Sequence, residues 1–328
     1  MALLFSHRNL DAEMMTAACR DLVCGKVEPV LASAFLAALR SKGESAEEIA
    51  SAVAVLRETM VHLPCDGPVV DTCGTGGDDA GTFNISTAAA LVTCACGVRV
   101  VKHGNRAVSG KTGSADVLME LGVPIESGVE WARDCLKRIG FAFCFAPHFH
   151  PGMANVAALR KMLGLRTIFN LLGPLSNPAN ASFQLIGVGK AELLDPISHA
   201  IAKLGTKRSV VVHGSDGLDE VTLSGPTSIR IVENDTVRSE KWTPEQFDLE
   251  PATIDSIRAG SATESATMIK RVLNGERTPA YRFVLANAAA TLWTVGIVET
   301  LPEAVNRAEQ AIDSGSANSV LDRLTERM

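Results

Sequence analysis

The sequence contains no apolar run that approaches the roughly 20 residues needed to span a bilayer. Its N-terminus also lacks the basic region, apolar core and cleavage site of a signal peptide, so we expect a cytoplasmic protein with no membrane partner. Positive charge is not in excess, because 31 Lys and Arg stand against 37 Asp and Glu, for a net charge of −6. This balance argues against a nucleic-acid partner but leaves room for a local basic pocket.

Cysteine is missing from the second half of the chain. The eight cysteines lie at positions 19, 24, 65, 73, 94, 96, 135 and 144, several of them within apolar runs. We interpret them as reduced, mostly buried thiols. Cys94 and Cys96 have the wrong spacing for a Cys-x-x-Cys metal or redox site. Cys73 borders a glycine-rich turn, and we expect a packing role there because no base is visibly paired with it.

The 328 residues show no internal repeat or low-complexity segment, and this length predicts one large domain with a smaller companion. Residues 1 to about 65 carry helical patterns only. The expected helices there are 12–23, 29–41 and 46–60, the last after the capping-box signal Ser45-Ala46-Glu47-Glu48. We therefore expect an N-terminal helical domain over residues 1–66 and an α/β domain over residues 67–328.

From residue 68 onward, strand and helix signals alternate. The expected strands are 69–71, 99–102, 141–145, 183–188 and 209–213, and the helices between them include 130–139 and 192–204. Such alternation predicts an α/β fold with a mostly parallel sheet flanked by helices. Residues 227–250 look polar and irregular apart from the strand-like segment 228–232, and residues 261–328 look helical.

A glycine-rich turn, Gly74-Thr75-Gly76-Gly77-Asp78, follows the first expected strand. It leads through Asn84-Ile85-Ser86-Thr87 into an apolar, helical stretch. Glycines let backbone N–H groups approach an anion closely, and Ser86 or Thr87 is suited to be the N-cap where the helix dipole favours negative charge. The pattern predicts an oxyanion at this turn.

A second glycine-rich turn repeats the arrangement. The expected strand 98–101 runs into Lys102-His103-Gly104-Asn105-Arg106, and a helix is expected at 114–121. Lys102, Arg106 and Lys111 crowd this loop. Lysine offers phosphate a point charge and arginine a fork of donors, so the loop favours a polyanion.

Two familiar nucleotide motifs each fail by one residue. A dinucleotide fingerprint that started at Gly74 would need glycine where the chain has Asp79. A Walker loop ending in Gly110-Lys111-Thr112 would need four residues after Gly104, and the chain has five. The remaining alternative, that these glycines serve only tight turns, is weakened by the flanking cations and caps at both loops.

An acidic turn, Asp216-Gly217-Leu218-Asp219-Glu220, follows the strand expected at 209–213. Such a turn is often only a turn. Two like charges about 4 Å apart at an effective dielectric near 20 repel by roughly 4 kcal/mol, so these carboxylates would oppose a diphosphate unless a metal lay between them. Magnesium suits this arrangement best, because one or two carboxylates plus substrate phosphates commonly hold it, and the Ser86 hydroxyl is a further candidate ligand.

Three further side chains leave alternatives open. Arg160 lies on the helix expected at 153–163, where a solvated face residue and a ligand are both plausible. His148 and His150 flank Phe149 in a proline-bounded loop, where metal binding competes with the stronger expectation of loop packing. Pro174 most simply ends the helical stretch expected at 167–172.

At these residues the chain resembles the anthranilate phosphoribosyltransferase family over nearly its full length and in the right order. The matching segments are Gly74 to Asp78, Thr82 to Thr87, Lys102 to Ser109, Gly113 to Asp116, Arg166 to Leu175 and Asp216 to Glu220. The resemblance implies transfer of the phosphoribosyl group of 5-phosphoribosyl-1-diphosphate to the amine of anthranilate in tryptophan synthesis. It also implies a nucleoside phosphorylase-like fold whose small helical domain is joined by helices from about 150–175, and a homodimer.

The resemblance also implies the site residues. Those that would hold the phosphoribosyl diphosphate are Gly74, Gly77, Asp78, Thr82, Asn84, Ile85, Ser86, Thr87, Lys102, His103, Gly104, Asn105, Arg106, Ala107, Val108, Ser109, Gly110 and Ser114. Anthranilate would contact Gly74, Asn105 and Arg160. Magnesium, with two ions per active site, would be held by Ser86, Asp219 and Glu220. No residue is assigned as an acid or base.

The chain departs from the family pattern in one phosphate loop. The usual Ser-Ser-Lys-Ser-Gly is here Ser109-Gly110-Lys111-Thr112-Gly113, so Gly110 keeps only its backbone N–H for a phosphate. Two other functions share this fold. A pyrimidine nucleoside phosphorylase would fuse the lysine-histidine and double-glycine elements into one turn, whereas here they lie apart at 102 and 74. A non-catalytic nucleic-acid-binding relative would carry a basic surface.

Overall fold

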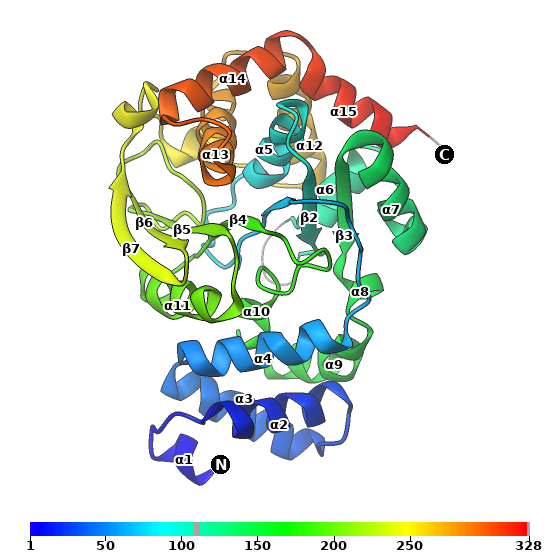
Figure 1. Cartoon of the computed structure of the whole chain (residues 1–328), viewed down its shortest axis with the longest axis vertical. Helices are drawn as coiled ribbons and strands as arrows, with labels where there is room; N and C mark the ends of the chain where they lie inside the picture. Colours follow the sequence, from blue (N-terminus) through cyan, green and yellow to red (C-terminus); the bar gives the residue numbers. More distant parts are fainter. Residues whose placement is uncertain (108–111, 327–328) are drawn as a thin grey trace.

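The computed structural model describes residues 1–107 and 112–326. The N-terminal helices α1 (Ala2–Phe5), α2 (Ala12–Val23), α3 (Pro29–Lys42) and α4 (Ala46–Thr59) lie together at one end of the molecule (Figure 1). Helix α9 (Ala154–Leu163) joins them, and its Val156 and Leu159 belong to the same apolar core as Leu36 of α3. Residues far apart in the sequence therefore build this helical layer, while the domain boundary at residue 66 stays a prediction.

Local signals explain where these helices begin. The Asp11 carboxylate accepts a hydrogen bond from the Met14 backbone N–H at 2.8 Å and caps α2. Helix α4 starts with the capping box expected from the sequence, in which the Ser45 hydroxyl accepts from the Glu48 N–H and the Glu48 carboxylate accepts from the Ser45 N–H. These reciprocal bonds satisfy N–H groups that lack partners inside the helix.

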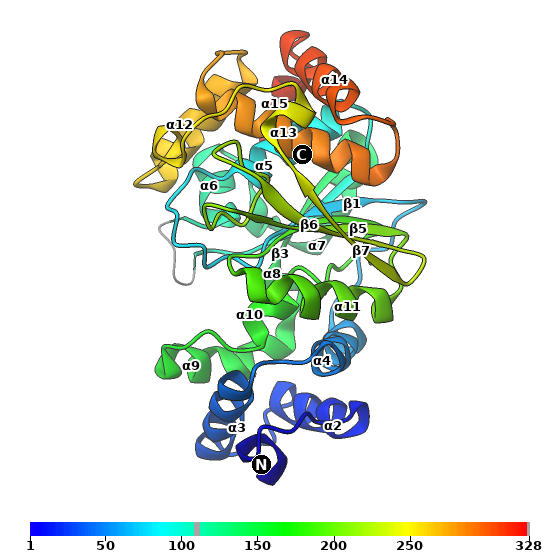
Figure 2. The same ribbon diagram turned by 90° about the vertical axis from the view of Figure 1, so that its left-hand side faces the viewer.

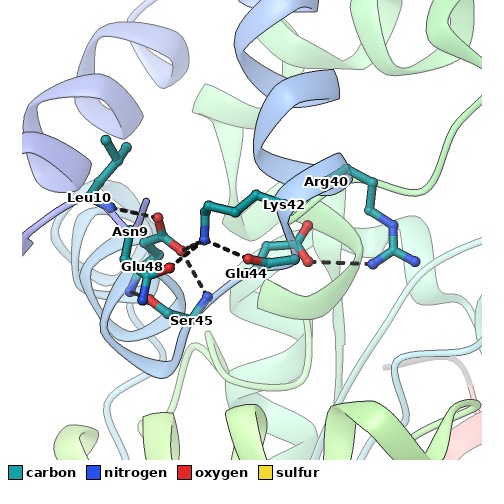
Figure 3. A network of polar contacts seen from close by, with 8 residues as sticks. Asn9, Leu10, Arg40, Lys42, Glu44, Ser45 and Glu48 are labelled. Atoms are coloured by element: carbon teal, nitrogen blue, oxygen red, sulfur yellow. Dashed lines mark hydrogen bonds and ion pairs between the residues drawn. The ribbon is translucent and has the colours of Figure 1, made fainter. Parts of the chain in front are cut away.

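A buried ion pair joins α3 to α4 (Figure 3). The Lys42 ammonium lies 2.8 Å from the Glu48 carboxylate, and the two side chains are 3% and 0% exposed. Lys42 also donates to the Asn9 side chain, and Glu48 also accepts from the Leu10 N–H at 2.9 Å. The pair therefore holds the segment before α2 against the α3–α4 junction.

The described residues form a seven-stranded sheet in the order β3-β2-β1-β4-β5-β6-β7. The strands are β1 (Val70–Thr72), β2 (Val100–Gly104), β3 (Phe141–Phe145), β4 (Phe183–Gly187), β5 (Arg208–Gly214), β6 (Thr227–Glu233) and β7 (Thr236–Trp242). Strands β1 to β5 pair in parallel, and β6 and β7 add an antiparallel edge. The prediction of a mostly parallel α/β sheet with a smaller helical part is confirmed.

Helices cover both faces of the sheet. Alternate residues of β5 point to opposite sides, because Val210 and Val212 join one apolar core and Val211 joins the other. Helices α5 (Ile85–Ala95) and α13 (Pro279–Val295) pack on the first face, and α11 (Leu194–Leu204) packs on the second, between the sheet and α4 (Figure 2). The remaining helices are α6 (Ser114–Glu120), α7 (Gly128–Ile139), α8 (Ala146–Phe149), α10 (Phe169–Leu172), α12 (Ala262–Leu273), α14 (Leu301–Asp313) and α15 (Ser316–Thr325).

Two expectations about local structure are wrong. Residues 227–250 are not irregular, because β6 and β7 form a hairpin whose turn places Asn234 and Asp235 at φ of 50° and 62°. Asn and Asp tolerate this left-handed conformation better than most residues, which allows the two-residue turn. Helix α5 begins at Ile85 with Asn84 as its N-cap, so neither Ser86 nor Thr87 caps it. No described helix is long and apolar enough to cross a membrane.

Candidate active site

A cleft of about 990 Å³ opens at the carboxyl ends of β1 and β2. Both glycine-rich turns line it on the sheet side, as expected for ligands of parallel sheets. Leu56 of α4 and Met153, Ala157 and Arg160 near or on α9 line it on the helical side. The cleft therefore lies between the sheet and the helical layer.

Most of the residues predicted from the sequence meet in this cleft. Those that line it are Gly74, Gly77, Asp78, Thr82, Asn84, Ile85, Ser86, Lys102, His103, Gly104, Asn105, Arg106, Ala107, Ser114, Arg160, Asp219 and Glu220. Thr87 is not among the lining residues, its side chain is 0% exposed, and its hydroxyl finds no hydrogen-bond partner in the described part of the chain. Val108, Ser109 and Gly110 lie outside the described residues.

Two backbone N–H groups of the first turn are hydrogen-bonded to residues far away in the sequence. The Thr75 N–H donates to the Gly187 carbonyl at 2.8 Å, and the Gly76 N–H donates to the Asp219 carboxylate at 3.0 Å. A Cβ on Gly74 would lie 2.8 Å from that carboxylate, and Gly77 has φ of 82°. Glycine is therefore required at both positions for the backbone to take this path.

Two part-buried carboxylates lie behind the first turn. Glu220 accepts a hydrogen bond from the Ser86 N–H at 3.1 Å, and the Lys102 ammonium donates to the Ser86 hydroxyl at 3.2 Å. Burial raises the pKa of Glu220 to about 7, against the opposing charge of Lys102. Burial, together with the charges of Asp78 and Glu220, raises the pKa of Asp219 well above its usual range. Lys102 therefore offsets the charge of Glu220 only in part, and the two neighbouring carboxylates still favour a further cation.

This donor set fits a hard divalent cation. Asp219, Glu220 and Ser86 offer only oxygen atoms, which are the ligands that magnesium prefers. No group of three or more His, Cys, Asp or Glu side chains within residues 1–107 and 112–326 forms a ready-made metal site. Magnesium commonly keeps waters and takes substrate phosphates as ligands, so two carboxylates and a hydroxyl suffice as the protein's share.

The second turn is anchored through buried polar groups. Lys102 is 2% exposed and donates to the Thr72 carbonyl, which places its charge beside Glu220 at the floor of the cleft. The His103 N–H donates to the Asp71 carboxylate at 3.2 Å. Asp71 also accepts from the Asn177 side chain at 2.7 Å, and burial raises its pKa to about 6. These contacts fix β1 and β2 to each other where the two turns begin.

One carboxylate fastens both sides of the second loop. Asp116 of α6 accepts from the Ala107 N–H and from the Gly113 N–H, each at 2.9 Å. Arg106, expected at the phosphates, also contacts Glu126 in an exposed ion pair. Surface pairs of this kind contribute little, so Arg106 can leave Glu126 for a phosphate at small cost.

Arg160 reaches the cleft from α9. Its guanidinium forms no hydrogen bond or ion pair with the part of the chain that the structure describes. Burial, and the nearby charge of Arg166, lower its pKa from the usual value. A part-buried arginine that lines a cleft without a partner suits a carboxylate ligand, because its fork matches the two oxygens.

Two histidines pack together on the cleft wall. The rings of His103 and His150 lie with their centroids 4.9 Å apart, and the His103 Nδ1 bonds to the Gly173 carbonyl at 2.8 Å. His148 lies edge-on to Phe145 instead and does not line the cleft. His148 and His150, which are close in the sequence, therefore have different neighbours in the structure. The contact between His103 and His150 joins residues too far apart in the sequence for a local pattern to indicate it.

Arg166 is a cleft residue to which sequence reasoning gave no role. It lies between α9 and α10, and its guanidinium donates to the carbonyls of Thr75 and Gly76 at 2.7 and 2.8 Å. In the sequence, Arg166 stands out only as a basic residue near Arg160 in a segment that resembles the family. No sequence pattern indicates its partner 90 residues away.

Comparisons with known proteins identify the family of the chain. The glycosyl transferase family models match residues 2–60 for the helical bundle domain and residues 66–318 for the a/b domain. An anthranilate phosphoribosyltransferase of Parasynechococcus marenigrum is 45% identical over 332 residues, covering 100% of this chain and 95% of the relative. The crystal structure of the Thermus thermophilus anthranilate phosphoribosyltransferase has a TM-score of 0.92 at 40% identity, covering 99% of this chain and 97% of that one.

Two structures of the Saccharomyces cerevisiae enzyme hold ligands. One, in complex with PRPP and Mg, has a TM-score of 0.89 at 28% identity and covers 99% of this chain and 97% of that one. The other, with 4-fluoroanthranilate, has a TM-score of 0.87 at 28% identity and covers 98% of this chain and 94% of that one. The chain belongs to the anthranilate phosphoribosyltransferases, enzymes of the glycosyl transferase family.

Proposed function

We propose that the cleft transfers the phosphoribosyl group of 5-phosphoribosyl-1-diphosphate to the amine of anthranilate and releases diphosphate. The observation that carries this proposal is the pairing of two opposed features in one cleft. The Gly74–Asp78 turn, backed by Asp219 and Glu220, suits the diphosphate. The guanidinium of Arg160, which has no partner among residues 1–107 and 112–326, suits the carboxylate of the acceptor. The two ligands would then meet between the sheet and the helical layer.

The donor would lie across the sheet edge. The Gly74–Asp78 turn, Thr82 and the start of α5 would hold its diphosphate through backbone N–H groups and the helix dipole. The second loop would continue this grip with the residues from Lys102 to Gly110 and with Ser114. Of these, Lys102 would contribute its positive charge from the floor of the cleft, because its ammonium donates hydrogen bonds to the Ser86 hydroxyl and the Thr72 carbonyl. Thr87 would contribute only through its backbone, because its side chain is buried.

The proposed magnesium ligands are Ser86, Asp219 and Glu220, with two ions per active site. Support comes from the oxygen-only donor set and from the yeast relative that binds PRPP together with Mg. Bound magnesium would neutralise negative charge that develops on the departing diphosphate. The metal's positive charge would also offset the electrostatic cost of holding Asp219 and Glu220 close together. The metal would thereby stabilise the turn that Asp219 holds.

The proposed reaction is a direct displacement at C1 of the ribose. The anthranilate nitrogen supplies its lone pair to form the C1–N bond, the C1–O bond to diphosphate breaks with its electron pair on oxygen, and the amine then loses a proton. No described residue is needed to activate an amine that already holds a lone pair. Alignment by Arg160, Asn105 and Gly74, and charge stabilisation at the turn, would carry most of the acceleration.

We also propose a homodimer formed through the helical layer. Exposed apolar side chains gather on elements that pack together there: Phe5 of α1, Val30 and Leu31 of α3, Met162 of α9 and Leu165, which are 51% to 83% exposed. Contiguous exposed apolar surface often marks an interface between proteins. We further propose that the protein acts in the cytoplasm and supplies tryptophan synthesis.

One assay tests the proposed reaction. The protein is mixed with anthranilate, 5-phosphoribosyl-1-diphosphate and magnesium, and the loss of anthranilate fluorescence is followed. We expect turnover that needs all three components, and a loss of magnesium-dependent turnover in the double variant Asp219→Asn with Glu220→Gln. Unchanged turnover and magnesium dependence in that variant would show the metal ligands to be wrong. Consumption of the donor with another amine, but not with anthranilate, would redirect the acceptor.

A further inference from the structure

The Gly74–Asp78 turn is gripped from two opposite directions by side chains far away in the sequence. On one side, the Asp219 carboxylate accepts the Gly76 N–H at 3.0 Å. On the other side, the Arg166 guanidinium donates from a single nitrogen to the carbonyls of Thr75 and Gly76, at 2.7 and 2.8 Å. The peptide units around Gly76 are thus fixed through both their N–H and their C=O groups.

Gly77 fits this grip closely. A Cβ at Gly77 would overlap the guanidinium of Arg166, so a side chain there and the two carbonyl bonds exclude each other. Burial lowers the pKa of Arg166, and the nearby charges of Asp219, Asp79 and Asp78 oppose that shift. The guanidinium therefore fills the space that the absence of a side chain at Gly77 leaves, close to several carboxylates. Such a fitted contact is more specific than an ordinary surface contact.

Arg166 connects the two sides of the cleft. It follows α9, which carries Arg160, after the helix ends at Gly164 in a left-handed conformation with φ of 60°. It precedes α10, whose Phe169 and Asn170 also line the cleft. A shift of this segment must move Arg166, and Arg166 holds the turn through two charge-assisted bonds.

We propose that Arg166 is a positioning residue that sets the Gly74–Asp78 turn in the shape that receives the donor diphosphate. The inference rests on the proposed role of that turn in donor binding. Arg166 holds the Gly76 carbonyl away from the ligand and so points the N–H of the same peptide, that of Gly77, toward it, while Arg166 and Asp219 together fix the Thr75–Gly76 peptide. Without this hold, the Gly76–Gly77 peptide can rotate, and its carbonyl oxygen would face the phosphates.

The first test is steady-state kinetics of Arg166→Ala. We expect the KM for 5-phosphoribosyl-1-diphosphate to rise about 10- to 100-fold, the range that follows from a small misplacement of binding groups. The KM for anthranilate should change less than about 3-fold, in contrast to Arg160→Ala. Arg20→Ala, which removes an exposed arginine paired with Glu58, is the matched control and should leave both constants unchanged. A rise confined to the anthranilate KM would overturn the proposal, because Arg166 would then be an acceptor ligand.

The second test is a double-mutant cycle with Gly77→Ala. The new methyl group displaces Arg166, so Gly77→Ala already abolishes the hold, and adding Arg166→Ala should worsen the donor KM by less than about 3-fold. The strain of a side chain at this position, where φ is positive, is the same in both backgrounds and cancels in the cycle. Fully multiplicative effects of the two substitutions would contradict the proposal.

These outcomes separate the inference from the function on which it rests. If Gly77→Ala leaves the donor KM unchanged, the turn does not bind the donor and the proposed role of the turn fails. If Gly77→Ala raises the donor KM but Arg166→Ala does not, only the role of Arg166 fails. Circular dichroism checks that each variant folds. If Arg166→Ala does not fold, Arg166→Gln replaces it. We expect this variant too to raise the KM for the donor and to leave the KM for anthranilate nearly unchanged.

Discussion

Burial in the cleft changes the pKa values of His103 and His150 from those of a histidine in water. Burial lowers the pKa of His103 to about 3 and that of His150 to about 4, from a usual 6.5. Both imidazoles are therefore neutral in the folded protein near pH 7. His103 can donate only from Nδ1, toward the Gly173 carbonyl, which leaves Nε2 as an acceptor.

Acid should therefore destabilise the fold through these rings. The unfolded chain binds protons at His150 near pH 6.5, whereas the folded chain resists them until about pH 4, so stability is lost as pH falls through this window. We expect the free energy of unfolding to depend on pH less steeply in His150→Gln, by up to about 1.4 kcal/mol per pH unit. Urea denaturation across that pH range measures it. His62→Gln, an exposed control, should keep the original slope.

Arg160 is the residue on which the acceptor assignment depends. Arg160→Ala should raise the KM for anthranilate about 10- to 100-fold, since a hydrogen bond to a charged group contributes roughly 1.5–3 kcal/mol. The donor KM should change little. The neighbouring exposed Lys161→Ala gives the matched control for a lost cation on α9. Equal effects of Arg160→Ala on both substrates would point to a structural role instead.

At the scale of secondary-structure elements, the junction of α3 and α4 depends on the buried pair of Lys42 and Glu48. Lys42→Met leaves the Glu48 carboxylate without its cation at a site of 0% exposure. We expect a loss of about 3–5 kcal/mol in the free energy of unfolding, because an uncompensated buried charge is strongly destabilising.

An exposed pair supplies the comparison. Arg20 and Glu58 lie 2.7 Å apart, with side chains 48% and 56% exposed, so Arg20→Met should cost less than about 1 kcal/mol. Chemical denaturation of both variants measures the difference. Similar small losses in the two would mean that the Lys42 contact is worth no more than a surface pair.

The elements also show what local sequence can predict. The apolar run at 141–145 predicts a strand and β3 lies there, because five consecutive apolar residues can be buried on both sheet faces. Strand β7 escapes detection, since its residues Thr236 to Lys241 are mostly exposed and half of them are charged. An edge strand with one solvated side loses the apolar pattern that identifies its neighbours, and only the Asn234-Asp235 turn remains as a signal.

For the whole molecule, the sequence indicates the sheet and both glycine turns but not the contacts that cross the cleft. The grip of Arg166 on Thr75 and Gly76, and the packing of His103 on His150, join segments from different elements. Local periodicity carries no information about such pairs. Thr87 marks the same limit, because a helix that begins at Ile85 rotates that side chain into the core.

The proposed dimer makes a prediction at this scale. Val30 is 83% exposed and Leu31 is 52% exposed, so Val30→Glu with Leu31→Glu should place charges in the interface and yield monomers. Light scattering coupled to size-exclusion chromatography measures the mass. Ile297→Glu changes an exposed apolar residue that follows α13, a helix that lies away from the helical layer (Figure 1), and should keep the original mass. A monomeric starting protein would refute the dimer directly.

The distribution of cysteines has a practical consequence for following motion of the cleft. All eight thiols are free, and burial raises the pKa of Cys19, Cys65, Cys73, Cys94, Cys96, Cys135 and Cys144, which suppresses their reactive thiolates. Cys24 is exposed at the end of α2, where the neighbouring Val23 carbonyl accepts from Asn155 of α9. A brief reaction with a maleimide dye would thus label the native protein selectively on its helical layer. The chain therefore carries its own attachment point for a fluorescent reporter on the helical side of the cleft.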